Sequence, residues 1–424
     1  MPEFASATAP SGQADIAVAS ELIDGLAALA VRVGLNLQPG QELVMTAPVS
    51  ALPLVRAIVR EAYRSGAAMV TPLLSDSTVT LARFVHGQDA CFDRAPAWLY
   101  QGMANAFEGG AARLALVGED PMLLSAQDPA RLSRANRANA QAYRPALTAI
   151  AGFHINWSIL SCPTQDWAQR IFPDLPPADA LSRLAEAIRI TARLDKDDPV
   201  GAWAAHNAGL RKRCEMLNAA RFDALHFRAP GTDLRVGLAD GHWWQGGASE
   251  ARNGVICNPN IPTEEVFTTP HAARVDGYVR ATKPLSHQGA LLDEIEMRFE
   301  NGRAVSARAA RGEDVLQDML ATDPGAAHLG EVALVPHSSP VSQTGLLYFN
   351  TLFDENAASH IAMGQCYASC FEHGDTLVKE DIAKRGGNES LIHVDWMIGS
   401  GQMDVDGLHD GAEPVALMRK GEWV

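Results

Sequence analysis

The sequence lacks the long apolar segments and the cysteine patterns that several classes of protein require. No apolar run approaches the ~20 residues of a membrane-spanning helix, and no basic stretch precedes a short apolar core near the start. We therefore expect no membrane partner and a cytoplasmic location. The six cysteines include no Cys-x-x-Cys pair, which favours reduced thiols over a disulfide framework or a structural zinc site.

Basic charge is also scarce. The chain carries 35 Lys and Arg residues against 50 Asp and Glu residues, a formal net charge of -15 at pH 7. A nucleic-acid-binding protein needs clustered basic residues to displace counterions from phosphates, so we expect no nucleic-acid partner. The sequence also has no phosphate loop, no dinucleotide fingerprint and no Gly-x-Ser-x-Gly elbow. These absences disfavour a nucleotide-binding protein and a serine hydrolase.

The composition that is present is typical of a globular protein with more than one domain. The 424 residues are 47% hydrophobic and 20% charged, and this length is long for one core. We expect a flexible tail at residues 1–15, where small and polar residues dominate. We further predict an α/β domain with a mainly parallel sheet at 16–215 and an α+β domain at 216–424.

Strand-like and helix-like segments alternate through the first half of the chain, which is typical of a mainly parallel sheet covered by helices. The predicted strands cover residues 41–47, 68–74, 112–118 and 146–155. The predicted helices cover residues 51–66, 128–144, 177–193 and 203–220. The second half is richer in strands, beginning with 225–228 and 233–238 and a hairpin that turns at Asp240-Gly241 into Trp243-Trp244.

The segment at 390–399 carries the clearest chemical signal. It is predicted to be a strand, in which successive side chains point to opposite faces. Its apolar residues would pack on one face, and His393 and Asp395 would project from the other. An imidazole and a carboxylate together suit a divalent metal ion, although a His–Asp hydrogen bond within a sheet is the plainer interpretation of this pair alone.

Further acidic residues stand near predicted strands and turns. Glu264 and Glu265 lie in a turn flanked by prolines, where adjacent side chains face opposite ways, so that one can enter a site while the other supports it. Glu331 stands near the start of an apolar strand predicted at 329–335. Taken alone, acids in such positions are more typical of a solvated surface.

A helix is predicted over residues 353–367. In that helix His360 and Tyr367 would share a face, because seven positions are close to two turns. The helix is entered through Asp354 or Asn356, and Glu355 would reach the site from that entry turn. Asp404 and Asp406 lie beside a glycine turn and are expected to be exposed.

Together these segments offer two imidazoles and four carboxylates. Such a set is too large for one tetrahedral zinc ion but suits two divalent ions, Zn, Co, Mn or Mg, that share a bridging carboxylate. The six predicted metal ligands are Glu265, Glu331, Glu355, His360, His393 and Asp395.

Four stretches of the sequence resemble the aminopeptidase T and aminopeptidase S family of dinuclear metallopeptidases. They are Pro-Gly-Thr-Asp-Leu-Arg-Val-Gly-Leu (230–238), Asn-Ile-Pro-Thr-Glu-Glu-Val-Phe-Thr-Thr-Pro (260–270), Phe-Asp-Glu-Asn-Ala-Ala-Ser-His-Ile-Ala-Met-Gly (353–364) and Ile-His-Val-Asp-Trp-Met-Ile-Gly (392–399). The resemblance implies an N-terminal α/β domain, a C-terminal domain that carries the metals, and a homodimer.

The resemblance also implies roles for individual residues. It matches Glu355 and Tyr367 to active-site positions, and it matches a further five residues to metal ligands: Glu265, Glu331, His360, His393 and Asp395. Two alternatives stay open. Either Glu264 or Glu265 could be the ligand in the 260–270 stretch, and Glu355 could bind a metal or accept a proton.

The implied activity is release of N-terminal residues from peptides by a metal-activated water. Glu355 or Glu264 would move the proton, and Tyr367 would donate a hydrogen bond to the oxyanion. The alternative is a mononuclear non-haem iron dioxygenase that cleaves rings and uses His360, His393 and Asp395. Such an iron triad has no need of the other glutamates.

Overall fold

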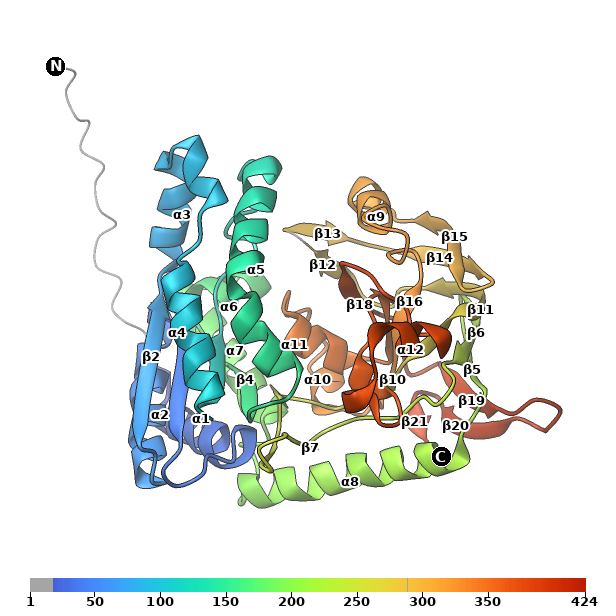
Figure 1. The fold of residues 1–424 in the computed structure, drawn as a ribbon, viewed down its shortest axis with the longest axis horizontal. Coiled ribbons are helices and arrows are strands. Elements are labelled where there is room, and N and C mark those ends of the chain that lie inside the picture. Colours follow the sequence, from blue (N-terminus) through green and yellow to red (C-terminus); the bar gives the residue numbers. More distant parts are fainter. Residues whose placement is uncertain (1–17, 288) are drawn as a thin grey trace.

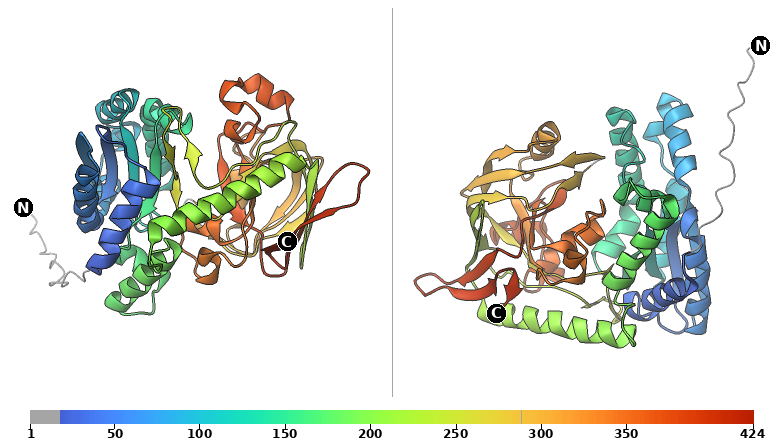
Figure 2. Two further views of the ribbon diagram at one scale, coloured as in Figure 1. Left: turned by 90° about the horizontal axis from the view of Figure 1, so that it is seen from below. Right: turned by 180° about the vertical axis from the view of Figure 1, so that it is seen from behind.

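The computed structural model describes residues 18–287 and 289–424, and the tail predicted at 1–15 lies outside them. Figure 1 shows two parts, a sheet covered by helices and a group of antiparallel sheets. Helix α8 (Pro199–Ala220) runs along one side of both parts, as the views of Figure 2 also show. The predicted fold class is confirmed, whereas the domain boundary after residue 215, which falls within α8, stays a prediction.

The first part is built on a five-stranded parallel sheet, counted over the residues that the structure describes. Its last strand comes from far along the chain and leads directly to Glu264 and Glu265. The strand order is β2 (Met69–Ser75), β1 (Glu42–Pro48), β3 (Ala112–Val117), β4 (Trp157–Ser161) and β9 (Asn260–Ile261).

Both faces of this sheet are covered, because alternate residues of β1 enter different cores. Leu43 and Met45 pack on one face and Val44 on the other, as the period of two in a strand requires. The helices of the first face are α1 (Ser20–Leu29), α2 (Leu52–Arg64), α6 (Gln165–Ile171) and α7 (Pro177–Thr191), and those of the second are α4 (Ala97–Glu108) and α5 (Pro129–Ala151).

Most elements predicted for the first half are confirmed: the strands at 41–47, 68–74 and 112–118 and the helices at 51–66, 128–144, 177–193 and 203–220. The strand predicted at 146–155 is wrong, because α5 continues to Ala151 and β4 begins only at Trp157. Ala146, Ala149 and Ile150 are buried at helical spacing in the core shared with α4. The apolar residues that suggested a strand are therefore the buried stripe of a helix.

The second part contains two larger antiparallel sheets within the described residues. The four-stranded sheet has the order β10 (Val266–Thr268), β16 (Leu329–Leu334), β17 (His360–Gly364) and β18 (His393–Met397). The eight-stranded sheet has the order β15 (Arg303–Arg308), β14 (Glu296–Glu300), β11 (Pro270–Arg280), β6 (Thr232–Leu238), β5 (Ala224–Ala229), β19 (Asp404–Leu408), β20 (Val415–Arg419) and β21 (Glu422–Trp423).

One apolar core joins the two sheets, with Val236 from the larger sheet and Val332 and Trp396 from the smaller one. The strands predicted at 225–228, 233–238, 329–335 and 390–399 are confirmed, with shorter bounds for the last. The remaining elements are α3 (Ser77–His86), β7 (Ser249–Glu250), β8 (Ile256–Cys257), β12 (Leu285–His287), β13 (Ala290–Leu292), α9 (Glu313–Leu320), α10 (Pro340–Gln343), α11 (Thr351–Asp354) and α12 (Lys379–Lys384).

The helix predicted over 353–367 is wrong. α11 ends at Asp354, a single 3-10 turn covers Glu355–Ala357, and Ala358 is fully extended with φ -164° and ψ 158°. His360 then begins β17, which pairs with a strand on each side. Burial of β17 on both faces and pairing along both edges outweigh the local helical pattern.

Two further predictions are wrong in the second part. Trp243 and Trp244 do not form a strand, because β6 takes β5 and β11 as its partners and Trp244 is buried in the core instead. Asp406 is not exposed: its side chain is 3% exposed and accepts hydrogen bonds from Arg228 and Arg419. Separately, no helix in the described part of the chain combines the length and apolar character that crossing a bilayer requires.

Candidate metal centre

The four-stranded sheet carries most of the predicted metal ligands on one face. Ala362 at the middle of β17 lies opposite Glu331 on one side and Asp395 on the other. Because side chains two apart share a face, His360 and His393 point the same way as these acids. Ala362 itself is small, which leaves room between the acidic and imidazole groups.

The opposite face of the same strands explains why the ligands are held in place. Val332, Ile361 and Trp396 alternate with the ligand residues along the three strands and are 0% exposed in the core. A shift of one residue in any strand would move this apolar set out of the core. The register that buries the apolar residues therefore also gathers the polar ones.

Glu331 lies between the two imidazoles. One carboxylate oxygen is 3.5 Å from Nε2 of His360, and the other is 3.6 Å from Nε2 of His393. Glu265, placed just before β10, approaches Nε2 of His360 at 3.1 Å, and Asp395 lies 3.4 Å from Nε2 of His393. These atoms form two groups that share Glu331, the arrangement in which a single carboxylate bridges two ions.

Both imidazoles use their other nitrogen for a contact with the backbone. Nδ1 of His360 lies 3.1 Å from the carbonyl of Ala358, and Nδ1 of His393 lies 2.7 Å from the carbonyl of Gln365. A carbonyl accepts a hydrogen bond, so each Nδ1 donates to its backbone carbonyl, and each Nε2 faces the carboxylates. Metal-binding histidines are commonly fixed in this way.

The chemistry of the buried atoms fits divalent cations. Oε2 of Glu265, Nε2 of His360 and Oδ1 of Asp395 are buried and have no hydrogen-bond partner among the residues that the structure describes. Burial also raises the pKa of the Glu331 carboxyl to about 7. Buried acceptors that have no donor are costly, and a cation shared among several carboxylates satisfies them and keeps the acids ionised.

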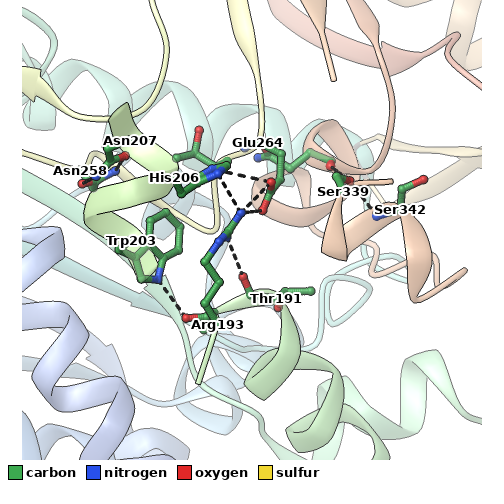
Figure 3. A network of polar contacts seen from close by, with 12 residues as sticks. Thr191, Arg193, Trp203, His206, Asn207, Asn258, Glu264, Ser339 and Ser342 are labelled. Atoms are coloured by element: carbon green, nitrogen blue, oxygen red, sulfur yellow. Dashed lines mark hydrogen bonds and ion pairs between the residues drawn. The ribbon is translucent and has the colours of Figure 1, made fainter. Parts of the chain in front are cut away.

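Glu264 and Glu265 point to opposite sides, as an extended segment requires. The side chain of Glu264 is 3% exposed and faces away from the metal ligands, toward Arg193 at 2.8 Å. Figure 3 shows this carboxylate between Arg193 and His206. The structure therefore brings Glu265 to the ligand cluster and places Glu264 in a buried ion pair.

Glu355 and Tyr367 lie at the edge of the cluster. Glu355 and Asp395 line the same recess, and burial followed by the charge of Glu265 raises the pKa of Glu355 well above its usual value. The Tyr367 ring packs 4.6 Å from the His393 ring, centroid to centroid, and is 44% exposed. Glu355 does not belong to either of the two close ligand groups.

Three residues that surround Glu264 were not predicted from the sequence. Arg193 and His206 contact its carboxylate, and the Asn356 side chain accepts a hydrogen bond from its backbone N–H at 2.7 Å. Arg193 and His206 come from the first half of the chain, and no local pattern links them to the 260–270 stretch. One general rule could have indicated such a partner: a glutamate that becomes buried needs a cationic side chain beside it.

Comparison with known proteins agrees with this geometry. The thermophilic metalloprotease (M29) family matches residues 19–423. Aminopeptidase T of Thermus thermophilus is 53% identical over 402 residues, covering 95% of this chain and 98% of that protein. Aminopeptidase AmpS of Bacillus subtilis is 38% identical over 404 residues, covering 95% of this chain and 98% of that protein.

A solved structure gives the same result. Wild-type AmpT from Thermus thermophilus matches with a TM-score of 0.91 and 52% identity, covering 95% of this chain and 99% of that chain. The resemblance found in the sequence is confirmed. The chain belongs to the thermophilic metalloprotease (M29) family and is a hydrolase that acts on peptides.

Proposed function

We propose that this protein is a metal-dependent aminopeptidase that removes N-terminal residues from peptides and holds two divalent ions per chain. The position of Glu331 between the imidazoles of His360 and His393 carries the proposal. Glu265 and His360 would hold one ion, His393 and Asp395 the other, and Glu331 both. Oxygen and nitrogen ligands of this kind accept Zn, Co, Mn or Mg, so the fit does not select one metal.

Two ions at this site, when bound, lower the pKa of a water toward neutrality and polarise the scissile carbonyl. The residues of the chain would do the rest. Glu355, whose pKa is raised above its usual value by burial and by the charge of Glu265, would take the proton of the water and return it to the leaving amine. Tyr367 would donate a hydrogen bond to the oxyanion of the tetrahedral intermediate.

Glu355 is better supported than Glu264 as the proton-transfer residue. The carboxylate of Glu264 is engaged by Arg193 and faces away from the ligand cluster. Glu355 lines the recess that Asp395 also lines, and the hydrogen bond that its carboxylate accepts from Asn356 is long at 3.4 Å. We therefore assign proton transfer to Glu355 and assign Glu264 a role in support of Glu265.

The proposed substrates are peptides with a free amino terminus. The acidic surroundings of the site favour a cationic group such as that amine. A homodimer and a cytoplasmic location remain part of the proposal, and the net charge of -15 is consistent with the absence of a nucleic-acid partner.

Metal analysis tests the proposal against the dioxygenase alternative. The full chain would be stripped with a chelator and reloaded in turn with Zn²⁺, Co²⁺, Mn²⁺, Mg²⁺ and Fe²⁺. We expect about two ions per chain and release of N-terminal residues from aminoacyl-amide substrates after reloading with at least one of the first four. One Fe²⁺ per chain, with oxygen consumption and no peptide hydrolysis, would instead establish the oxygenase.

A further inference from the structure

The segment that carries Glu265 crosses between the two parts of the molecule. It begins at β9 in the parallel sheet and ends at β10 in the four-stranded sheet. Residues 262–265 lie outside both strands, so no ladder of backbone hydrogen bonds fixes this crossing. Other contacts must set the direction in which Glu265 points.

The side chain before Glu265 is fixed from the first part of the chain. Nη2 of Arg193 lies 2.8 Å and 2.9 Å from the two carboxylate oxygens of Glu264. Arg193 follows the end of α7 in a left-handed conformation, φ 59°, and its guanidinium lies 4.7 Å from the centroid of the Trp203 ring. Trp203 is 0% exposed and donates to the carbonyl of Ala192 at 2.9 Å, so the arginine has little freedom to move.

The backbone just before Glu264 is fixed as well. Nε2 of His206 lies 2.8 Å from the carbonyl of Thr263, and its Nδ1 lies 3.0 Å from Nη2 of Arg193. Both distances are satisfied by a neutral imidazole that donates to the carbonyl and accepts from the guanidinium. Figure 3 shows Arg193, His206 and Glu264 meeting at this point.

We propose that Arg193 is a positioning residue for the metal centre, which fixes Glu264 and His206 and so directs the adjacent Glu265 toward His360. The inference rests on the proposed metal-dependent function, because it concerns the geometry of a metal ligand. It also assigns the parallel-sheet part a role: through Arg193, that part sets the affinity of the site for the ion that Glu265 holds. Residues that contact a metal ligand without touching the metal fix the direction of that ligand, and mutating them typically lowers metal affinity by ~10–100-fold.

The Zn²⁺ affinity of the full chain would be measured by competition with a chromophoric chelator. Peptidase activity and the midpoint of thermal unfolding would be measured on the same samples. We expect Arg193→Met to weaken one of the two Zn²⁺ sites by about 10- to 100-fold. Arg193→Lys restores the charge without the planar fork and should recover part of that loss. If Arg193→Met does not fold, Glu264→Gln, which keeps the side-chain shape, should weaken the same site.

Arg228→Met is the control, because it also removes an arginine from a buried aspartate, but on the eight-stranded sheet. It should lower the thermal midpoint and leave both Zn²⁺ affinities unchanged. Unchanged Zn²⁺ affinities in every folded variant at Arg193 and Glu264 would overturn the inference. A wild-type chain that binds two Zn²⁺ ions yet releases no N-terminal residue would overturn the proposed function alone.

Discussion

Oε2 of Glu265 and Nε2 of His360 lie 3.1 Å apart, and neither atom has a hydrogen-bond partner within residues 18–287 and 289–424. Both residues are buried. Such a pair is costly in a protein core unless a third group joins it. A divalent cation would bind both atoms.

Glu331→Ala should abolish peptidase activity while the chain stays folded. The substitution removes both oxygens that face the imidazoles of His360 and His393, so the chain would lose the carboxylate that we propose for holding both ions. We expect kcat/KM to fall by at least about 100-fold. Steady-state kinetics with aminoacyl-amide substrates, bound-metal analysis and far-UV circular dichroism would measure the effect.

Glu61→Ala provides the control for Glu331→Ala. Glu61 is also a buried acid, but it pairs with Arg32 in the parallel-sheet part. That variant should lose stability and keep its kcat/KM. Near-normal turnover by Glu331→Ala would contradict the two-ion site.

Tyr367→Phe should lower kcat with little change in KM or in metal content. The ring would keep its packing against His393, and only the hydroxyl that donates to the oxyanion would be lost. Loss of one such donor typically costs ~100- to 1,000-fold in kcat. Tyr278→Phe, at an exposed tyrosine, is the control, and a kcat within twofold of wild type for Tyr367→Phe would remove the tyrosine from the mechanism.

The stability of the protein should fall with acidification because of His206. Burial, followed by the charge of Arg193, lowers the pKa of His206 to about 4. In the unfolded chain an imidazole titrates near pH ~6.5. Between these values the unfolded state binds a proton that the folded state does not, so stability is lost as the pH falls from about 6.5 to about 4. The expected cost at pH 5 is roughly 2 kcal/mol.

Urea unfolding at pH 7 and at pH 5 would measure this contribution. His206→Gln keeps a donor for the carbonyl of Thr263 and does not titrate, so its stability should differ less between the two pH values than that of wild type. His86→Gln, at an exposed histidine, should retain the wild-type difference. An equal loss in wild type and His206→Gln would show that other groups cause the acid sensitivity.

Asp406→Ala should destabilise the fold without affecting catalysis. The carboxylate is buried between Arg228 and Arg419, both of which are partly exposed. Removing one partner of a buried ion pair typically costs ~3–5 kcal/mol, and partial hydration of the arginines reduces the expected loss to about 1–3 kcal/mol. Urea unfolding would show it. A loss below about 0.5 kcal/mol would instead fit the exposed acid that the sequence suggests.

The sequence by itself determined those features that depend only on residues close together in the chain. The alternation in 392–397 is a property of one strand, so it placed His393 and Asp395 on one face correctly, and the pairing with β17 confirms it. The family resemblance rests likewise on contiguous stretches, and comparison with known proteins confirmed it. Which of Glu264 and Glu265 turns toward His360 did not follow from those stretches.

Long-range contacts decided the rest. Residues 353–367 have a helical pattern, yet pairing with β16 and β18 makes His360 part of a strand. Glu264 turns away from the ligand cluster because Arg193, from the end of α7, lies on the other side of the crossing segment. A local propensity changes the free energy of folding by a few tenths of a kcal/mol per residue, whereas burying a side chain or breaking a buried ion pair changes it by several kcal/mol. The residues that make those buried contacts become neighbours only when the chain has folded.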